Sequence, residues 1–157
     1  MKVDDETLEA MKVHARETYP DECCGWLVGL PGGDTRVVRM RNYQDQAHAD
    51  DPERFPRTAR TAYYPHPTDL LAATELVDSP GHCLLAMYHS HPDHDAYFSE
   101  EDLAQATPFG EPTYPEALQI VVSVYDGEVR DVKAFAWSAD SAGYEGCAVG
   151  PEADPGP

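Results

Sequence analysis

The stretch that decides the fold is residues 83–102, CLLAMYHSHPDHDAYFSEED. Its first six residues, CLLAMY, are almost all apolar, which is typical of a strand covered on both faces. At the far end Ser99 precedes Asp102 by three positions, and serine followed by an acidic residue at this spacing is typical of a helix N-terminal cap. The stretch therefore predicts a buried strand, a loop, and a short helix that begins near Ser99.

Two histidines, His89 and His91, follow the apolar run. Residues two apart in an extended chain project from the same face, so both imidazoles reach one point. Zinc binds imidazole nitrogen and accepts a carboxylate as a further ligand, and Asp102 in the first helical turn is the candidate for that ligand. Three protein ligands leave a fourth position for water, which is the arrangement of a catalytic zinc. We interpret His94, which lies between two aspartates, as a solvated neighbour.

Each half of this pattern also has a plainer interpretation. An isolated His-x-His pair is more often a surface or core pair without metal, and Ser-x-x-Asp is more often a cap and nothing more. The combination favours a metal site because both halves bring ligands to one place. A water bound there needs a proton acceptor, and Glu22 is the candidate, although an exposed loop carboxylate is its plainer interpretation.

Working outward, helices and strands alternate along the chain. A first helix carries Leu8, Met11 and Ala15 at helical spacing and is stopped by Pro20. Apolar runs and turn residues predict strands at 25–30 and 35–42, a helix at 68–77, and a hairpin formed by 117–125 and 128–137. This order predicts an α/β (α+β) domain over residues 1–137, in which helices flank a curved mixed β-sheet.

Two segments fit neither helix nor strand. Residues 43–67 are rich in proline and aspartate, so they predict a structureless insert loop. Its arginines, Arg54, Arg57 and Arg60, make it either a solvated loop or a surface that docks the globular body of a partner protein. Residues 138–157 are dominated by Gly, Ala, Asp and Pro, which predicts a flexible acidic tail.

The composition excludes several classes of function. The net charge is −18, from 29 acidic against 11 basic residues, whereas nucleic acid and anionic membrane both require cationic surface. No stretch approaches the roughly 20 apolar residues of a membrane span, and the acidic start MKVDDE is unlike a signal peptide. Four cysteines without a C-x-x-C pair are typical of a reducing cytoplasm, and adjacent Cys23 and Cys24 are expected on opposite faces of a strand.

The ordered set of Glu22, His89-Ser90-His91, Ser99 and Asp102 resembles the motif of the JAMM (MPN-plus) zinc metalloproteases, in their single-domain prokaryotic branch. The resemblance implies a cytidine-deaminase-like JAB/MPN domain with one zinc ion per chain, held by His89, His91 and Asp102. It implies that Glu22 is the general acid and base, and that Ser99 stabilises the oxyanion. All the ligands of the motif are present.

This branch acts on ubiquitin-like or sulfur-carrier proteins joined through a C-terminal glycine. The resemblance therefore implies an (iso)peptidase that cleaves either an isopeptide bond to lysine or a residue attached to the carrier's tail. A non-catalytic scaffold module and a small-peptide zinc hydrolase without a carrier protein remain alternatives, and a homodimer is left open. A partner among nucleic acids or membranes is not expected.

Overall fold

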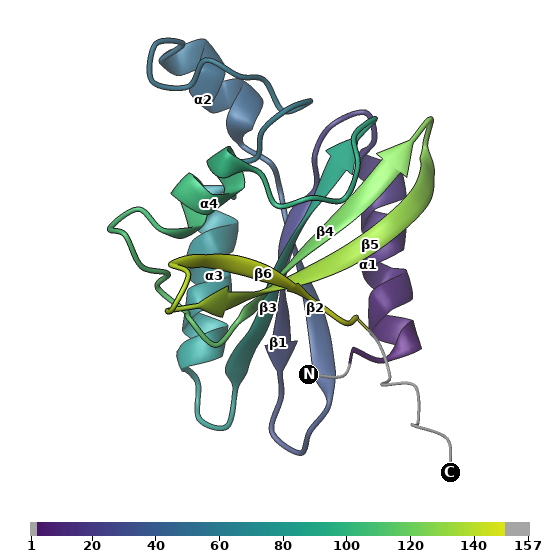
Figure 1. Ribbon diagram of the computed structural model, residues 1–157, viewed down its shortest axis with the longest axis vertical. Helices are drawn as coiled ribbons and strands as arrows, with labels where there is room; N and C mark the ends of the chain where they lie inside the picture. Colours follow the sequence, from purple (N-terminus) through teal and green to yellow (C-terminus); the bar gives the residue numbers. More distant parts are fainter. Residues whose placement is uncertain (1–2, 150–157) are drawn as a thin grey trace.

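The computed structural model describes residues 3–149 of the chain (Figure 1). Its helices are α1 (Asp5–Thr18), α2 (Gln44–Asp50), α3 (Pro67–Asp78) and α4 (Glu100–Ala106). Its strands are β1 (Cys24–Gly29), β2 (Thr35–Met40), β3 (Cys83–Pro92), β4 (Leu118–Tyr125), β5 (Glu128–Ser138) and β6 (Gly143–Cys147). The helices and strands predicted from the sequence are all present, and the strand predicted at 83–88 extends through both histidines.

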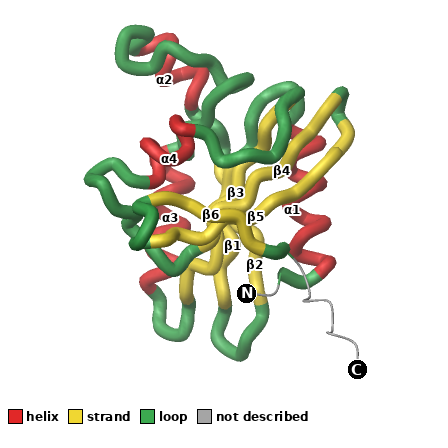
Figure 2. Tube along the Cα trace, viewed as in Figure 1, coloured by secondary structure: helices red, strands yellow, loops and turns green. Residues whose placement is uncertain are grey.

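The strands form one mixed sheet with the order β2-β1-β3-β4-β5-β6. Only β3 and β4 run parallel, and the other neighbouring pairs are antiparallel. The sheet is strongly twisted, with α1 on one face and α3 with α4 on the other (Figures 1 and 2). The predicted α/β class with a curved mixed sheet flanked by helices is confirmed.

Each face of the sheet has its own apolar core. Met11 of α1 packs with Leu27 and Tyr88 on one face, and Ala73 of α3 packs with Trp26 on the other. Cys23 belongs to the first core and Cys24 to the second, so the predicted opposite orientation of these two side chains is confirmed. All four cysteines are free thiols.

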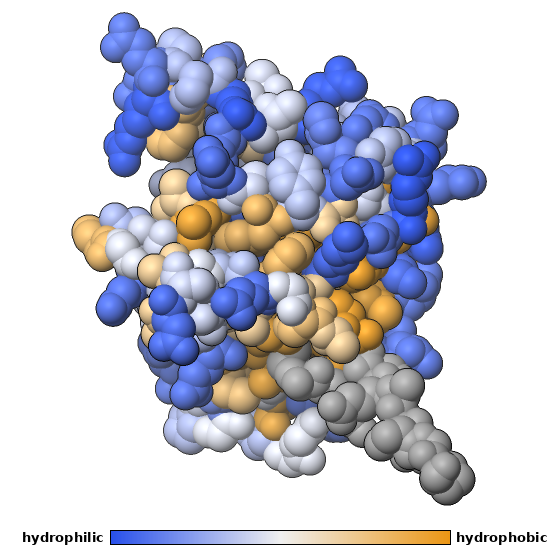
Figure 3. Space-filling view, viewed as in Figure 1, coloured by the Kyte–Doolittle hydropathy of each residue, from blue (hydrophilic) through white to orange (hydrophobic). Residues whose placement is uncertain are grey.

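The prediction of a structureless insert at 43–67 is wrong for Gln44–Asp50, which form α2. Polar contacts that apolar periodicity does not reveal help to order this segment. The Asn42 side chain donates to the carbonyls of Glu22 and Ala62 at 2.9 and 3.0 Å, and the Gln44 side chain donates to the carbonyl of Arg57 at 2.9 Å. Figure 3 shows the hydrophilic surface of this segment around α2.

The predicted tail also differs from the structure, because residues within 138–149 continue the sheet. β6 pairs antiparallel with β5, and Tyr144 packs against Phe98 and Trp137 with ring centroids 4.7 and 5.4 Å apart. Tyr144 and Val149, which packs against the first core, supply the apolar contacts of this Gly-rich segment. The remainder of the predicted tail, residues 150–157, lies outside the described residues.

Within residues 3–149, none of the helices combines the length and the apolar character that crossing a bilayer would require.

Candidate metal centre

The central strand β3 carries His89 and His91 to the end of the sheet at which α4 lies. Its neighbours fix the register, since His89 stands opposite Cys24 of β1 and Val121 of β4. Both imidazoles project from the same face, as predicted, and their Nε2 atoms lie 3.2 Å apart. His89 is fully buried and His91 nearly so. Two imidazole nitrogens held this close in a buried site need a proton or a cation between them.

Asp102 brings a carboxylate to the same point. Its Oδ1 lies 3.2 Å from Nε2 of His89, and its Oδ2 lies 3.3 Å from Nε2 of His91. A tetrahedron of ligands around zinc, with bonds of about 2.0–2.1 Å, has edges of about 3.3 Å. The two imidazole nitrogens and the two carboxylate oxygens of Asp102 therefore lie at separations close to this edge, and the three residues fit the metal that their chemistry implies.

A capping box holds Asp102 in this position. The Ser99 Oγ accepts a hydrogen bond from the Asp102 backbone N–H at 3.0 Å, and the Ser99 backbone N–H donates to Asp102 Oδ2 at 3.0 Å. The predicted cap is confirmed. Because a hydroxyl also carries one donor, the Ser99 O–H remains available to a group bound in front of α4.

Glu22 lies just before β1 and is 4% exposed. One of its oxygens and one nitrogen each of His89 and His91 all lie within 4.8 Å of one another. Its backbone N–H donates to the carbonyl of Ala59 at 2.8 Å, which ties this residue to the insert. Glu22 is thus within reach of the same point as Asp102, and the geometry admits it as a metal ligand or as a base for a bound water.

The surroundings of Glu22 and Asp102 shift the pKa values of the two carboxyl groups in opposite directions. Burial, reinforced by the negative charge of Asp102, raises the pKa of Glu22 to about 9. Burial also acts to raise the pKa of Asp102, but hydrogen bonds from His89 and His91 outweigh it and hold that pKa well below its usual range. In the absence of a metal ion, Asp102 is therefore the anionic carboxylate of the pair and Glu22 the protonated one.

The two histidines are oriented by different neighbours. Nδ1 of His91 is 2.9 Å from the carbonyl of Asp95, a contact that directs Nε2 toward Asp102. The ring of Tyr63 stacks on that of His89 at 4.6 Å between centroids, and His89 Nδ1 is buried without a hydrogen-bond partner. Burial lowers the pKa of His89, which favours the neutral form that binds metal. Sequence reasoning missed Tyr63, because nothing in its spacing marks it as a neighbour of His89.

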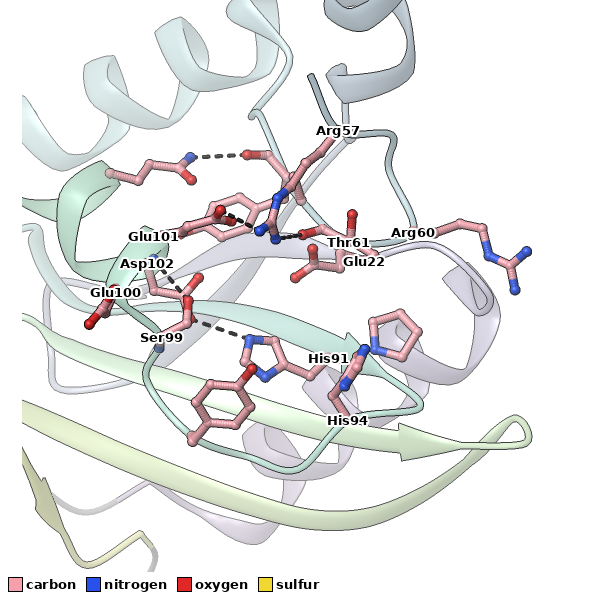
Figure 4. A pocket seen from close by; sticks show the side chains of 15 residues that line it. Glu22, Arg57, Arg60, Thr61, His91, His94, Ser99, Glu100, Glu101 and Asp102 are labelled. Carbon is pink, nitrogen blue, oxygen red and sulfur yellow. Dashed lines mark hydrogen bonds and ion pairs between the residues drawn. The ribbon is translucent and has the colours of Figure 1, made fainter. Parts of the chain in front are cut away.

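A cavity of about 410 Å³ opens in front of these groups (Figure 4). Glu22, His91, Ser99 and Asp102 line it together, so the structure assembles the residues that the sequence singled out, with His89 buried behind them. The exposed His94 lies at its rim. The insert contributes further lining residues: Arg57, Arg60, Thr61, Ala62 and Tyr63. Arg54 is not among them and instead lies over the ring of Phe55 at 5.2 Å.

Several known proteins are similar to this chain in sequence or in structure. CysO-cysteine peptidases of Mycobacterium bovis and Mycobacterium tuberculosis are 29% identical to this chain over 130 residues, which are 82% of this chain and 76% of theirs. A solution structure of a Salinibacter ruber protein matches with a TM-score of 0.64 and 28% identity, covering 100% of this chain and 95% of that one.

A JAB1/MPN domain protein from Archaeoglobus fulgidus has the same fold, with a TM-score of 0.51 and 19% identity over 96% of this chain and all of that one. The family described as prokaryotic homologues of the JAB domain matches residues 4–139. That match spans β1, β3 and α4, and with them every residue of the metal centre. The resemblance seen in the sequence is thereby confirmed, and the chain belongs to the prokaryotic JAB domain family.

Proposed function

We propose that this chain is a zinc-dependent peptidase that hydrolyses an amide bond at the C-terminal glycine of a ubiquitin-like or sulfur-carrier protein. One observation carries the proposal: two buried imidazole nitrogens and a buried carboxylate converge at 3.2–3.3 Å, beside a second buried carboxylate at the floor of an open cavity. The family supports a peptidase, and the mycobacterial relatives are named for CysO-cysteine, which supports a carrier-protein substrate.

In this proposal His89, His91 and Asp102 would hold the ion, which when bound would act as a Lewis acid and lower the pKa of the attacking water. A cation held beside Glu22 would offset the burial and the charge of Asp102 that raise its pKa in the metal-free site. Glu22 would then be ionised, accept a proton from that water and deliver it to the nitrogen of the leaving amine. The Ser99 hydroxyl, whose oxygen already accepts from the Asp102 N–H, donates to the developing oxyanion.

Metal analysis of three proteins tests the proposal. Glu22→Gln should keep about one zinc ion per chain and lose activity by several orders of magnitude, because the glutamate moves the proton but does not hold the metal. His89→Ala should lose both zinc and activity. The wild-type chain should bind zinc and cleave a tail peptide.

Other results point to the alternatives. A wild-type chain that binds no added zinc contradicts the proposal. Zinc binding without cleavage of any peptide or carrier favours a scaffold module. Equal rates on short peptides and on whole carriers favour a small-peptide hydrolase.

A further inference from the structure

The cavity in front of the metal centre contains two of the scarce basic residues of this chain. The sequence has 11 lysines and arginines against 29 acidic residues, yet Arg57 and Arg60 both line this one cavity. Both come from the insert. Arg60 forms no ion pair among the described residues, and its side chain points away from the cavity in Figure 4. Arg57 reaches over the cavity toward α4, so it is the arginine that a substrate would meet.

The position of Arg57 is fixed at both ends. Its Nη2 pairs with Glu101 Oε1 at 2.5 Å, and its Nη1 donates to the Thr61 carbonyl at 3.3 Å. Its own carbonyl accepts from the Gln44 side chain at 2.9 Å. The side chain remains 48% exposed. Because a guanidinium has five N–H donors in a rigid fork, donors remain for one more acceptor in the cavity.

The backbone of the insert ties Arg57 to the reaction centre. Two residues beyond Arg57, the carbonyl of Ala59 accepts from the N–H of Glu22 at 2.8 Å, and the N–H of Ala59 donates to Asp45 at 2.7 Å. The backbone of Glu22 is therefore hydrogen-bonded to the same short segment that carries Arg57. The positive charge of Arg57 therefore lies beside the proposed reaction centre. A docking surface for the globular body of a partner would lie farther from that centre.

The covalent geometry of the possible substrates decides what Arg57 meets. When a single residue follows the scissile bond, its α-carboxylate carbon is three bonds from the scissile carbonyl carbon, at most about 3.7 Å away. When the leaving group is a lysine side chain, only methylenes lie within that range. A substrate carboxylate placed beside Glu22, Glu101 and Asp102 would be repelled unless a cation paired with it.

We propose that Arg57 binds the free α-carboxylate of a single residue attached to the C terminus of the carrier, so that the chain removes terminal residues in preference to cleaving isopeptide bonds. This rests on the proposed function and names its substrate class. Water adds its oxygen to the scissile carbonyl carbon and the C–N bond breaks. The proton taken by Glu22 goes to the amine, so that the products are a carrier ending in a carboxylate and a free amino acid.

Paired peptides test the assignment directly. The probes are a synthetic tail peptide ending in Gly-Gly-Ala with a free carboxylate, its C-terminal amide, and the same Gly-Gly tail joined to the Nε of a blocked lysine. Wild-type enzyme should prefer the acid over both other probes by about 10- to 100-fold in kcat/KM, the worth of one charge-assisted contact. Arg57→Gln should remove this preference by slowing only the acid, and Arg57→Lys should restore part of it.

The matched control is Arg54→Gln, which removes the same charge from the same segment outside the cavity. It should retain the wild-type preference. If wild-type enzyme cleaves acid and amide equally, or if Arg57→Gln slows both equally, the assignment is wrong although the proposed function stands. A role of Arg57 in merely holding Glu101 would give the second result.

If no probe is cleaved, the proposed function fails. The role of Arg57 as a carboxylate-binding residue is then tested separately, by measuring peptide binding. Calorimetry with the zinc-loaded Glu22→Gln protein should then show tighter binding of the acid peptide than of the amide peptide. The double variant Glu22→Gln, Arg57→Gln should bind the two peptides equally. Equal binding of the two peptides would overturn the assignment.

Discussion

Glu22 and Asp102 are the same kind of group in nearly the same place, and their neighbours give them different roles. Asp102 accepts from two imidazoles and from the Ser99 N–H, which stabilises its anion. Glu22 is buried and faces the charge of Asp102, so its carboxyl favours the protonated form. The proposed function makes Asp102 a ligand and Glu22 a proton carrier, a difference that would arise from hydrogen bonding and burial rather than from residue type.

Ser99 caps α4, and the proposed function gives it a catalytic role as well; substitution separates the two. Ser99→Ala removes the helix cap, which should cost about 1 kcal/mol in free energy of unfolding. It also removes the oxyanion donor, which should lower kcat by about 10²–10³-fold. Zinc content should stay near one per chain, because Asp102 keeps both of its histidine contacts.

Ser99→Thr is the matched control, since it keeps the hydroxyl and should keep most of the activity. Zinc content and kcat are measured on the same samples. If Ser99→Ala loses its zinc together with its activity, then the hydroxyl acts only through the position of Asp102.

His14 gives the free energy of unfolding a pH dependence that is independent of the metal centre. Burial, reinforced by the charge of Arg39, lowers the pKa of His14 to about 4, and its Nδ1 lies 2.6 Å from the Tyr88 hydroxyl. The unfolded chain takes up this proton near pH 6.5, before the folded chain does. The contribution of His14 is therefore complete above pH 6.5 and is lost as the pH falls toward about 4.

Urea unfolding of the metal-free protein in chelator, at pH 7 and pH 5, measures this effect. The wild-type free energy of unfolding should fall between the two pH values by more than that of His14→Gln. Equal changes in the two proteins would show that His14 is not titrating as its burial requires.

Among the elements, the loop that follows β3 fixes the orientation of His91. The Tyr125 hydroxyl donates to Asp95 Oδ1 at 2.7 Å, and the Ser123 hydroxyl donates to the His94 carbonyl at 2.6 Å. Both donors belong to β4, the parallel neighbour of β3. The carbonyl of Asp95 that meets His91 Nδ1 is therefore held by the adjacent strand.

Removing the support that β4 gives to this loop should weaken zinc binding. Tyr125→Phe keeps the ring under Arg130 but loses the bond to Asp95, and the zinc dissociation constant should rise about 10-fold, the usual effect of a lost outer partner. Tyr19→Phe, which loses a bond to Asp93 in the same loop, should change the affinity less. Competition with a chromophoric chelator measures both, and equal effects would mean that the loop responds as a whole.

The elements also show how far the sequence could predict this molecule. The strand before His89 and the cap at Ser99 follow from local rules, the apolar run and the spacing to Asp102. Local rules did not predict α2 or β6. The side chains of Asn42 and Gln44 help to order α2, and the packing of Tyr144 helps to order β6. The stacking of Tyr63 on His89 joins segments 26 residues apart, which no local pattern records.

At the scale of the whole molecule, the sheet brings together three segments that are distant in sequence. The junction before β1 supplies Glu22, the insert supplies Arg57, and β3 with α4 supplies the three proposed ligands. β3 and β4 run parallel, and the end of β3 that carries His91 lines the cavity. α4 and the insert line the same cavity (Figures 1 and 4). Two of the 11 basic residues of this acidic chain, Arg57 and Arg60, line the cavity.

The most direct test of the account is a zinc-edge anomalous difference map from crystals of the zinc-loaded protein. We expect one peak per chain, about 2.0–2.1 Å from Nε2 of His89, Nε2 of His91 and one oxygen of Asp102, with Glu22 beyond bonding distance and facing a solvent ligand. A peak bonded to Glu22 in place of Asp102, or no peak between the two histidines, would contradict it.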